Sequence, residues 1–409
     1  MPSGFPRRIV IGADTYPPDV NGAANFAYRL ATGLAGRGHD VHVVCPAARD
    51  AGSERVTPGG PTVHRLVSYG TPFHPTFRVC VPWRIRGEVA RLLSRIAPDV
   101  VHVQSHFGVG RTLIAAARRA GVPVVATNHF MPENLIGYVP LPGRLAAAAC
   151  RLAWRDCRRV FRRARIVTAP TPRAVRLLRE QGLDGTILPV SCGLDLRRFA
   201  QHPGRGADER LRVLFVGRLD AEKNVDVLLR ALPLLPARLP VTVEIVGDGS
   251  RRGELEGLAR TLGVADRVVF HGLVGDQEVL DAYARCDVFC MPGTAELQSL
   301  ATMEAMAAGK PVVAADAMAL PHLVHPGRNG LLFPPGDAPA LAAALGSILG
   351  DPAVRAEMGD ASREIVARHD IAATLDTFES LYQEAAEASR RLSTARRGDR
   401  YEHPAHSGR

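Results

Sequence analysis

The segment TAELQSLATMEAMAAGKPVVAADA at 294–317 holds two glutamates, Glu296 and Glu304, with seven residues between them. The pattern places Glu296 in a loop after a strand and Glu304 in the first turns of a helix that begins near Ser299. Backbone N–H groups at a helix start attract phosphate, and carboxylates accept hydrogen bonds from sugar and ribose hydroxyls. A phosphate and sugar or ribose hydroxyls could therefore bind here. A capped helix with one solvated glutamate is the plain alternative.

Lysine is nearly absent from this chain, so the lysines that it keeps stand out. Of 51 basic residues only Lys223 and Lys310 are lysines, and the rest are arginines. The net charge of +10 is also uneven, since residues 1–200 carry +16 and the remainder carries −6. A basic front half indicates an anionic partner. An arginine-rich composition with solvated faces explains the same numbers equally well.

The overall composition is that of a folded soluble protein. A chain of 409 residues predicts two or three domains, and 46% apolar with 22% charged residues excludes extensive disorder. No apolar run is long enough to span a membrane, and the N-terminus does not read as a signal peptide. Seven cysteines without a C-x-x-C pair predict reduced thiols and no zinc site. We therefore expect a cytoplasmic protein.

Short apolar runs alternate with helix-length stretches, which is the pattern of parallel βα units. The predicted strands lie at 7–14, 40–46, 99–105, 122–127, 164–170, 185–190, 212–218, 241–248, 267–272, 287–292, 310–316 and 330–333. The polar, Gly- and Pro-rich stretch 200–210 predicts a domain boundary. The expected fold class is α/β, with two Rossmann-like, doubly wound parallel-sheet domains facing a cleft. We place the first domain at 1–200 with a returning helix 371–388, the second at 201–370, and a disordered basic tail at 390–409.

Several segments, in order along about 1–385, resemble the retaining glycosyltransferases of family 4, whose fold is called GT-B. They are DTYPPDVNGAANF (14–26), GRGHDVHVV (36–44), PDVVHVQSHFG (98–108), TNHF (127–130), VGRLDAEKNVDVLL (216–229) and the E-x7-E segment followed by EAMAxGxPVV. The resemblance implies that the second domain binds a nucleotide sugar and that the first binds the acceptor.

The resemblance also assigns roles to matching residues. Arg218 and Lys223 would neutralise the diphosphate, Glu304 would bind the ribose, and Glu296 and His129 would contact the donor sugar. The catalytic candidates are therefore His129, Glu296, Arg218 and Lys223. The donor-binding candidates are Gly22, Arg218, Lys223, Gly247, Glu296, Gln298, Ser299, Leu300 and Glu304, and the acceptor-binding candidates are Asn21, His106 and Glu133. No metal ligand is predicted.

The chain departs from the family at one point, since Glu296-Leu297-Gln298-Ser299 stands where most members read EGFG. Gln298 could add a sugar contact there, and some bacterial diacylglycerol glucosyltransferases are similar at this E-x-Q, which hints at a glycolipid acceptor. The segment CRLAWRDCRRVFRRAR at 150–165 has an apolar helical stripe among seven arginines. We expect the stripe to pack on the sheet, and the arginine face can touch anionic lipid.

Together these features predict a retaining, metal-independent hexosyltransferase that needs no cofactor. Its donor would be a nucleotide-diphosphate sugar, UDP-glucose first and GDP-mannose second. Its acceptor would be a membrane glycolipid, or alternatively a soluble small molecule or antibiotic precursor. The expected partners are the donor, the acceptor and an anionic membrane surface at the inner face, but not nucleic acid. The alternatives from other classes are a polyanion-binding protein and a nucleotide-sugar-binding protein without transferase activity.

Overall fold

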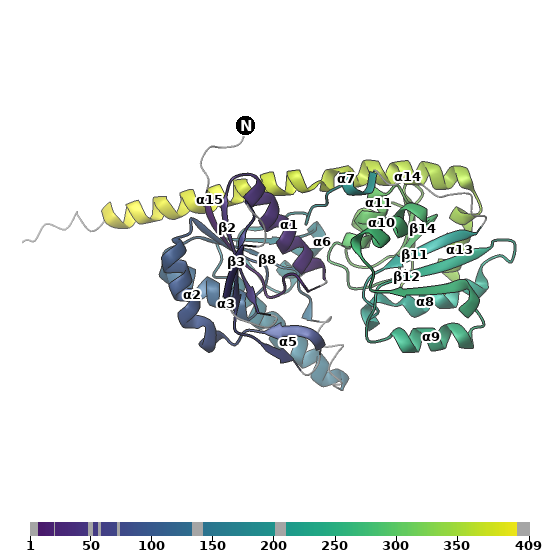
Figure 1. Ribbon diagram of the computed structural model, residues 1–409, viewed down its shortest axis with the longest axis horizontal. Coiled ribbons are helices and arrows are strands. Elements are labelled where there is room, and N and C mark those ends of the chain that lie inside the picture. The colour runs from purple at the N-terminus through teal and green to yellow at the C-terminus, as the bar shows by residue number, and fades with distance from the viewer. Residues whose placement is uncertain are drawn as a thin grey trace, which may run out of the picture. The chain divides into compact units, whose positions relative to one another are not determined.

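A mostly parallel sheet lies at the centre of each of two units in the computed structural model (Figure 1). The structure describes residues 7–19, 21–47, 52–55, 59–71, 74–132, 142–200 and 210–398. Unit 1 comprises Met1–Val190 with Thr374–Arg409, and unit 2 comprises Ser191–Ala373. The chain thus enters unit 2 ahead of the 200–210 stretch that the composition marks, and residues 201–209 lie outside the described part.

In the described residues of unit 1, the main sheet has eight strands in the order β10-β9-β8-β7-β1-β2-β4-β3. Neighbouring strands are parallel except for the edge pair β3–β4. The strands are β1 (Arg8–Gly12), β2 (Asp40–Pro46), β3 (Gly52–Arg55), β4 (Thr62–Leu66), β7 (Val100–Val103), β8 (Val124–Thr127), β9 (Ile166–Ala169) and β10 (Ile187–Pro189). Apart from the edge pair β3–β4, they carry valine and isoleucine in the pattern of strands that are buried on both faces.

Helices cover both faces of this sheet. In Figure 1 helices α2 and α3 lie on one side and α1 lies on the other. The helices of unit 1 are α1 (Gly22–Gly36), α2 (Pro82–Ile96), α3 (Gly108–Arg119), α5 (Gly143–Phe161) and α6 (Pro172–Glu180), and a hairpin of β5 (Tyr69–Thr71) and β6 (His74–Val79) precedes α2. Local capping sets the helix starts, since the side chain of Asn21 accepts a hydrogen bond from the Ala24 N–H at α1.

Unit 2 has six parallel strands, counted among its described residues, in the order β13-β12-β11-β14-β15-β16. They are β11 (Leu211–Val216), β12 (Val241–Val246), β13 (Val268–Gly272), β14 (Val288–Met291), β15 (Val312–Ala315) and β16 (Gly330–Phe333). The helices are α7 (Arg197–Ala200), α8 (Val225–Ala231), α9 (Arg252–Thr261), α10 (Asp276–Arg285), α11 (Leu300–Ala307), α12 (Leu320–Leu323), α13 (Ala338–Leu349) and α14 (Pro352–Val366), with short 3-10 turns at Ala221–Lys223, Leu232–Leu234, Ala265–Arg267 and Ala367–His369. In Figure 1 helices α8 and α9 cover one side of the sheet, and α10 and α11 cover the other.

The predicted α/β class with two doubly wound sheets is confirmed, and each predicted strand has its counterpart. The sequence analysis missed β3, β4 and the β5–β6 hairpin, because these short strands carry polar residues, glycine or proline where a buried strand would carry an aliphatic run. No helix in the described residues is long and apolar enough to cross a membrane.

The last helix, α15 (Ile371–Gly398), is longer than expected. Residues 390–398 are helical, which corrects the prediction of disorder from 390, while 399–409 lie outside the described residues. No proline or glycine interrupts the segment before Gly398, so the helix has no local reason to stop earlier. From Thr374 onward the helix belongs to unit 1.

A buried histidine on β7 attaches α15 to the sheet of unit 1. The ring of His102 is fully buried, with Nδ1 2.7 Å from the Tyr382 hydroxyl and Nε2 2.6 Å from Thr127 Oγ1. Burial lowers the pKa of His102 to about 3, because the charged imidazolium would lose its hydration, and the nearby His129 adds to the effect. The unfolded chain takes up a proton at this residue below pH 6.5, so its contribution to stability falls as the pH drops from 6.5 toward 3.

Replacement of the Tyr382 hydroxyl should destabilise unit 1. Tyr382→Phe leaves one nitrogen of a fully buried imidazole without its partner, which costs about 1–3 kcal/mol. Urea denaturation followed by circular dichroism measures the loss. The control is Tyr28→Phe, since Tyr28 is 41% exposed and its loss should cost under about 0.5 kcal/mol. Equal stability of the two variants would contradict the role assigned to Tyr382.

Unit 2 contains a buried carboxylate between cations. Glu244 on β12 has a side chain only 3% exposed, and Arg285 Nη2 lies 2.5 Å from its Oε2. Arg212 also pairs with it, and His271 Nε2 lies 3.3 Å away. Burial raises the pKa of Glu244, but the hydrogen bonds and charges of Arg285 and Arg212 outweigh burial, so the net shift is downward. The carboxylate therefore stabilises the fold above the unfolded pKa, and this contribution is lost as the pH falls through the lower folded value.

Glu244→Gln should lower the free energy of unfolding at pH 7 by about 3 kcal/mol, because it leaves two partly buried arginines without their anion. The difference from the wild type should shrink as the pH falls below 4.5, because the unfolded wild-type chain then takes up a proton at Glu244 while the folded chain, with its lower pKa, does not. Denaturation series between pH 7 and pH 3 provide the measurement. Glu364→Gln is the matched control, because the exposed Glu364–Arg328 pair should contribute under about 1 kcal/mol. A pH-independent difference for Glu244→Gln would refute the electrostatic explanation.

Candidate functional site

Two loops of unit 2 meet at the point where its strand order reverses. Loop 217–224 follows β11, and loop 292–299 follows β14, the neighbouring parallel strand. The chain runs from β11 to β12 and β13 in one direction, then returns to place β14 on the other side of β11. In open parallel sheets ligands bind beyond the carboxyl ends of the strands at such a switch point. The topology therefore brings the two predicted segments to one site.

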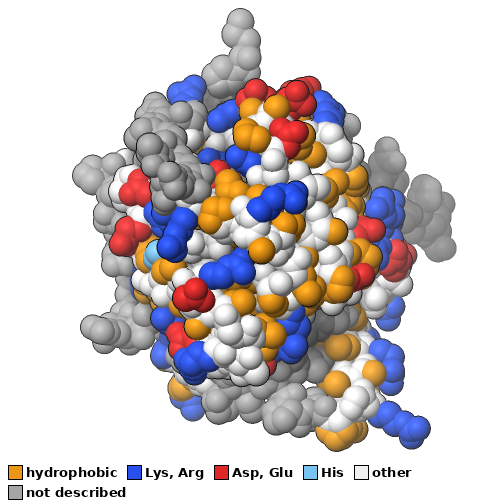
Figure 2. All heavy atoms as spheres, turned by 90° about the vertical axis from the view of Figure 1, so that its right-hand side faces the viewer, with side chains coloured by type: hydrophobic (Ala, Val, Ile, Leu, Met, Phe, Trp, Pro, Cys, Tyr) orange, Lys and Arg blue, Asp and Glu red, His pale blue; other side chains and the backbone are white. Residues whose placement is uncertain are grey.

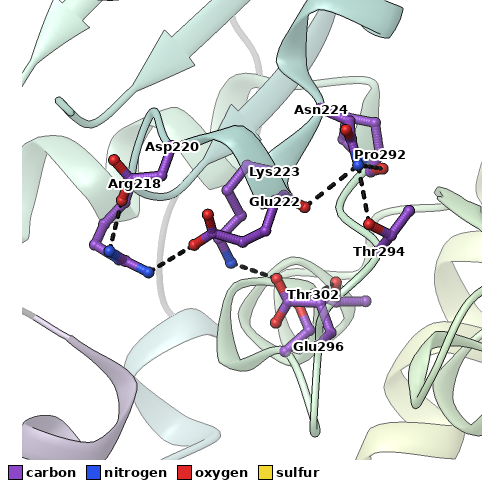
Figure 3. Close-up of polar contacts among 10 residues, drawn as sticks. Arg218, Asp220, Glu222, Lys223, Asn224, Pro292, Thr294, Glu296 and Thr302 are labelled. Atoms are coloured by element: carbon purple, nitrogen blue, oxygen red, sulfur yellow. Dashed lines mark hydrogen bonds and ion pairs between the residues drawn. The ribbon is translucent and has the colours of Figure 1, made fainter. Parts of the chain in front are cut away.

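The predicted cations and one predicted glutamate lie together at this site (Figure 3). Lys223 Nζ pairs with Glu296 Oε1, and the two side chains are 17% and 11% exposed. Arg218 donates to Asp220 Oδ2 at 2.5 Å and to Glu222 Oε1 at 2.7 Å, and its side chain is 38% exposed. Each cation is thus balanced by a carboxylate while it stays within reach of solvent. An entering anion can compete for both.

Asn224 fixes the spacing of the two loops. Its Nδ2 donates to Thr294 Oγ1 at 3.1 Å and to the Pro292 carbonyl at 3.5 Å (Figure 3). The Thr294 N–H donates to the Glu222 carbonyl at 3.0 Å, which adds a backbone bond between the loops. Asn224 itself has φ +47°, a left-handed conformation that asparagine tolerates better than most residues. The Lys223–Glu296 pair is therefore held by a polar frame.

Helix α11 begins at this site with a strained residue. Ser299 has φ +65° and ψ +85°, and it stands where the family that the sequence resembles usually carries glycine. Its hydroxyl lies 2.8 Å from Thr302 Oγ1 and does not cap a backbone N–H. The helix therefore starts at Leu300 with no N–H group satisfied by the Ser299 side chain, and such N–H groups bind anions.

Glu304, the second glutamate of the motif, lies one turn inside α11. The buried Tyr283 of α10 donates its hydroxyl to Glu304 Oε2 at 2.9 Å. This contact orients the half-buried carboxylate, and burial together with the charge of Glu304 raises the pKa of Tyr283. Sequence reasoning did not find Tyr283, because a tyrosine in an ordinary amphipathic helix gives no signal of its partner.

Gln298 faces the protein. Its Oε1 accepts the Cys192 N–H at 2.9 Å, and its Nε2 donates to Ser191 Oγ at 2.7 Å. Ser191 Oγ also lies 2.9 Å from His369 Nδ1, and Gln298 is 4% exposed. Both ends of the amide are thus engaged within unit 2. This geometry gives Gln298 a structural role beside the site, and its contact with a donor sugar stays a prediction.

Gly247 allows the loop after β12 to pack on the loop after β11. It has φ +132°, and a Cβ at this position would lie 1.9 Å from the Gly217 carbonyl oxygen. Any other residue would push the two loops apart. The structure accounts for Gly247 through this close backbone approach, and its contact with a donor stays a prediction.

In unit 1 the predicted His129 ends a buried polar chain. Its Nε2 lies 2.8 Å from Gln104 Oε1, and Gln104 Nε2 lies 3.4 Å from the ring of His102. These residues follow or belong to the adjacent strands β7 and β8. Burial lowers the pKa of His129 to about 4, so the imidazole is neutral at neutral pH. A neutral ring offers a hydrogen bond to a hydroxyl group.

The acceptor candidates differ in what surrounds them. Asn21 Oδ1 caps α1 and also accepts from Thr15 Oγ1 at 3.3 Å, and Gly22 is the exposed first residue of that helix. His106 is 2% exposed among the rings of Phe107, Phe130 and Phe161, and burial lowers its pKa to about 4. Glu133 lies outside the described residues. Among the described residues, no group of three His, Cys, Asp or Glu is arranged to hold a metal ion.

The sequence analysis left two site carboxylates unassigned. Asp220 is 6% exposed and accepts from Ser250 Oγ at 2.9 Å as well as from Arg218. Glu222 carries the second contact of Arg218. Both lie inside the segment RLDAEKN, two and four positions after Arg218. This spacing was the sequence signal from which their contact with Arg218 could have been predicted. In sum, unit 2 presents an arginine, a lysine and a helix start to an anion, with two glutamates beside them.

Comparison with known proteins identifies the family of the chain. A family model described as Glycosyltransferase Family 4 matches residues 20–198, and one described as Glycosyl transferases group 1 matches residues 210–351. A GDP-mannose-dependent alpha-mannosyltransferase of Mycobacterium tuberculosis is 33% identical over 81% of this chain and 84% of its own length. A D-inositol 3-phosphate glycosyltransferase of Streptomyces avermitilis is 33% identical over 73% of this chain and 68% of its own length.

Solved structures show the same fold at lower identity. Sucrose-phosphate synthase from Thermosynechococcus elongatus matches with a TM-score of 0.77 and 22% identity, covering 93% of this chain and 100% of its own. The Anabaena protein HepE in complex with UDP-glucose matches with a TM-score of 0.72 and 20% identity, covering 92% and 100%. Both units of the chain are thus accounted for, and the protein belongs to glycosyltransferase family 4, with the GT-B fold.

Proposed function

We propose that this enzyme transfers a mannosyl group from GDP-mannose to an acceptor hydroxyl, with retention of the anomeric configuration. The observation that carries the proposal is the cluster of Arg218, Lys223 and Glu296 at the switch point of unit 2, next to the start of α11. These groups match the chemistry of a sugar diphosphate, which has two anionic phosphates on one side of the reacting carbon and hydroxyl groups on the other.

Departure of the nucleoside diphosphate is the difficult step, because negative charge develops on the leaving oxygen. Arg218 and Lys223 would exchange their carboxylate partners for phosphate oxygens, and the N–H groups at Leu300 would add partial positive charge. Release of Lys223 would free the carboxylate of Glu296 to accept hydrogen bonds from the sugar. Glu304, held by Tyr283, would bind the ribose hydroxyls.

Retention is proposed to follow from front-face attack. The acceptor hydroxyl would approach the anomeric carbon from the side of the departing phosphate, form the new C–O bond as the old one breaks, and give its proton to a phosphate oxygen. This route needs no carboxylate nucleophile and no metal ion. The neutral His129 would act by hydrogen bonding to sugar hydroxyls.

The named relatives support GDP-mannose over UDP-glucose. The mannosyltransferases of Mycobacterium tuberculosis and Mycolicibacterium smegmatis are each 33% identical to this chain over 339 residues, and both carry GDP-mannose in their names. The UDP complexes are found among structures near 20% identity, which support the fold only. UDP-glucose therefore becomes the second donor.

The acceptor is proposed to be a lipid-linked alcohol that binds unit 1, and a soluble small molecule is the alternative. Relatives that are named D-inositol 3-phosphate glycosyltransferases act on a polar alcohol, which keeps the soluble alternative open. Asn21, His106 and Glu133 stay the acceptor candidates, although the burial of His106 makes it the weakest of the three.

Donor identity is tested by thermal unfolding of the full chain with GDP-mannose, UDP-glucose, ADP-glucose and dTDP-glucose. A ligand at 100 times its dissociation constant adds about 2.7 kcal/mol. We expect a shift with GDP-mannose alone, which Glu304→Ala and Lys223→Ala should reduce. Each variant is compared with its own ligand-free state, because Lys223→Ala also leaves the buried Glu296 without its cation.

A shift with UDP-glucose alone would overturn the choice of base and sugar while leaving the site intact. No shift with any donor would refute the transferase proposal. A donor shift with no hydrolysis and no transfer to any alcohol would instead identify a nucleotide-sugar-binding protein.

Removal of the phosphate-binding cations should slow the reaction more than it weakens donor binding. Arg218→Ala should lower kcat by about 100-fold, the usual cost of losing one charge-stabilising group in a transition state. The control is Arg230→Ala in the same unit, whose side chain is 55% exposed and 3.9 Å from Asp226. Release of GDP measures the rate, and proton NMR of the product reads the anomer. An inverted product, or an unchanged kcat for Arg218→Ala, would contradict the mechanism.

A further inference from the structure

Helix α5 buries one face in unit 1. Trp154, Cys157, Val160 and Phe161 are at most 4% exposed, and they form the apolar stripe predicted at 150–165. The expectation that this stripe packs inward is confirmed. Asp156, at the edge of the helix, pairs with Arg111 of α3. The stripe is therefore occupied, and only the opposite face of α5 can meet a partner.

That opposite face exposes two leucines among arginines. Leu145 is 57% exposed and Leu152 is 64% exposed, and their separation of seven residues places them on the same side of the helix. The side chains beside them at helical spacing are also exposed: Arg144, Arg151, Arg155 and Arg159. We call these six residues the arginine–leucine face. Their spacing puts apolar tips and positive charge on one surface.

The charge of this face is uncompensated within the described part of the chain. None of its four arginines forms an ion pair with a described residue, whereas some other exposed arginines do, such as Arg162 with Asp184 and Arg328 with Glu364. Figure 2 shows the contrast on another face of the molecule, where blue and red side chains are interspersed. A run of unpaired arginines beside exposed leucines stands out from this general mixture.

We propose that the arginine–leucine face docks on an anionic lipid bilayer. The arginines would lie among lipid phosphates, and Leu145 and Leu152 would enter the boundary of the acyl chains, as in other basic interfacial helices. A nucleic acid would use the arginines but leave both leucines in water. The leucines therefore favour lipid. This docking extends beyond the proposed sugar transfer and does not depend on it.

The test is co-sedimentation of the full chain with large unilamellar vesicles in 0.1 M salt. Vesicles of phosphatidylcholine with 30% phosphatidylglycerol should bind the protein, and pure phosphatidylcholine should not. Arg151→Gln with Arg155→Gln should weaken binding about 25-fold, at about fivefold for each arginine near an anionic surface. Leu145→Ser with Leu152→Ser should weaken it about tenfold or more through lost apolar contact.

Matched controls come from exposed residues of unit 2. Arg238→Gln with Arg260→Gln removes the same charge, and Leu273→Ser removes a leucine that is 73% exposed. Each control variant should leave vesicle binding within about twofold of the wild type, because the replaced residues are not part of the arginine–leucine face. Unchanged melting temperatures in the ligand-free state show that the variants fold.

Equal binding to neutral and anionic vesicles, or equal losses in the control variants, would overturn the proposal. Binding of a 20-base-pair DNA duplex that survives the double leucine substitution, without vesicle binding, would identify a polyanion surface instead. Because the vesicles carry no donor or acceptor, their binding and the thermal shift with GDP-mannose can fail independently.

Discussion

The reversal of strand order beside β11 governs what unit 2 can do. Because β14 pairs with β11 on the side away from β12, the loops after β11 and β14 emerge as neighbours with no strand between them. Lys223 reaches Glu296 across this point, and Asn224 joins the same two loops. A largely buried carboxylate needs a partner, so the ion pair and the topology support each other. The cations proposed to bind phosphate are thereby held in place, and preorganised charge of this kind would stabilise a departing diphosphate.

The start of α11 shows how this chain replaces the glycines usual in its family. Ser299 keeps a left-handed backbone that glycine would adopt without strain. Gln298 directs its amide to Ser191 and Cys192, the first residues of unit 2, and Ser191 contacts His369 near the end of that unit. These bonds supply a structural reason for the strained turn to persist. The departure from the family pattern thus strengthens the frame around the site.

Sequence patterns were better at proposing site residues than at predicting which side chains those residues contact. A motif keeps the glutamates and the Arg218–Lys223 pair at fixed spacing, so the sequence could propose them, and the structure brings Lys223 and Glu296 into contact. Asp220 was given no role although it lies two positions after Arg218 in the same motif. Its second contact, with Ser250, joins segments 30 residues apart and has no local signal. The direction of the Gln298 amide could not be predicted either, because it depends on Ser191, 107 residues away.

The sequence by itself determined the alternation of strands and helices, the two sheets, the family motifs and the inward stripe of α5, because each depends on periodicity or on neighbours in the chain. Only the tertiary structure decided which side chains meet. It paired Lys223 with Glu296, placed Tyr382 against His102 across 280 residues, and left Leu145 and Leu152 uncovered on α5. These outcomes depend on contacts between distant segments and on burial, and the local order of residues predicts neither of them.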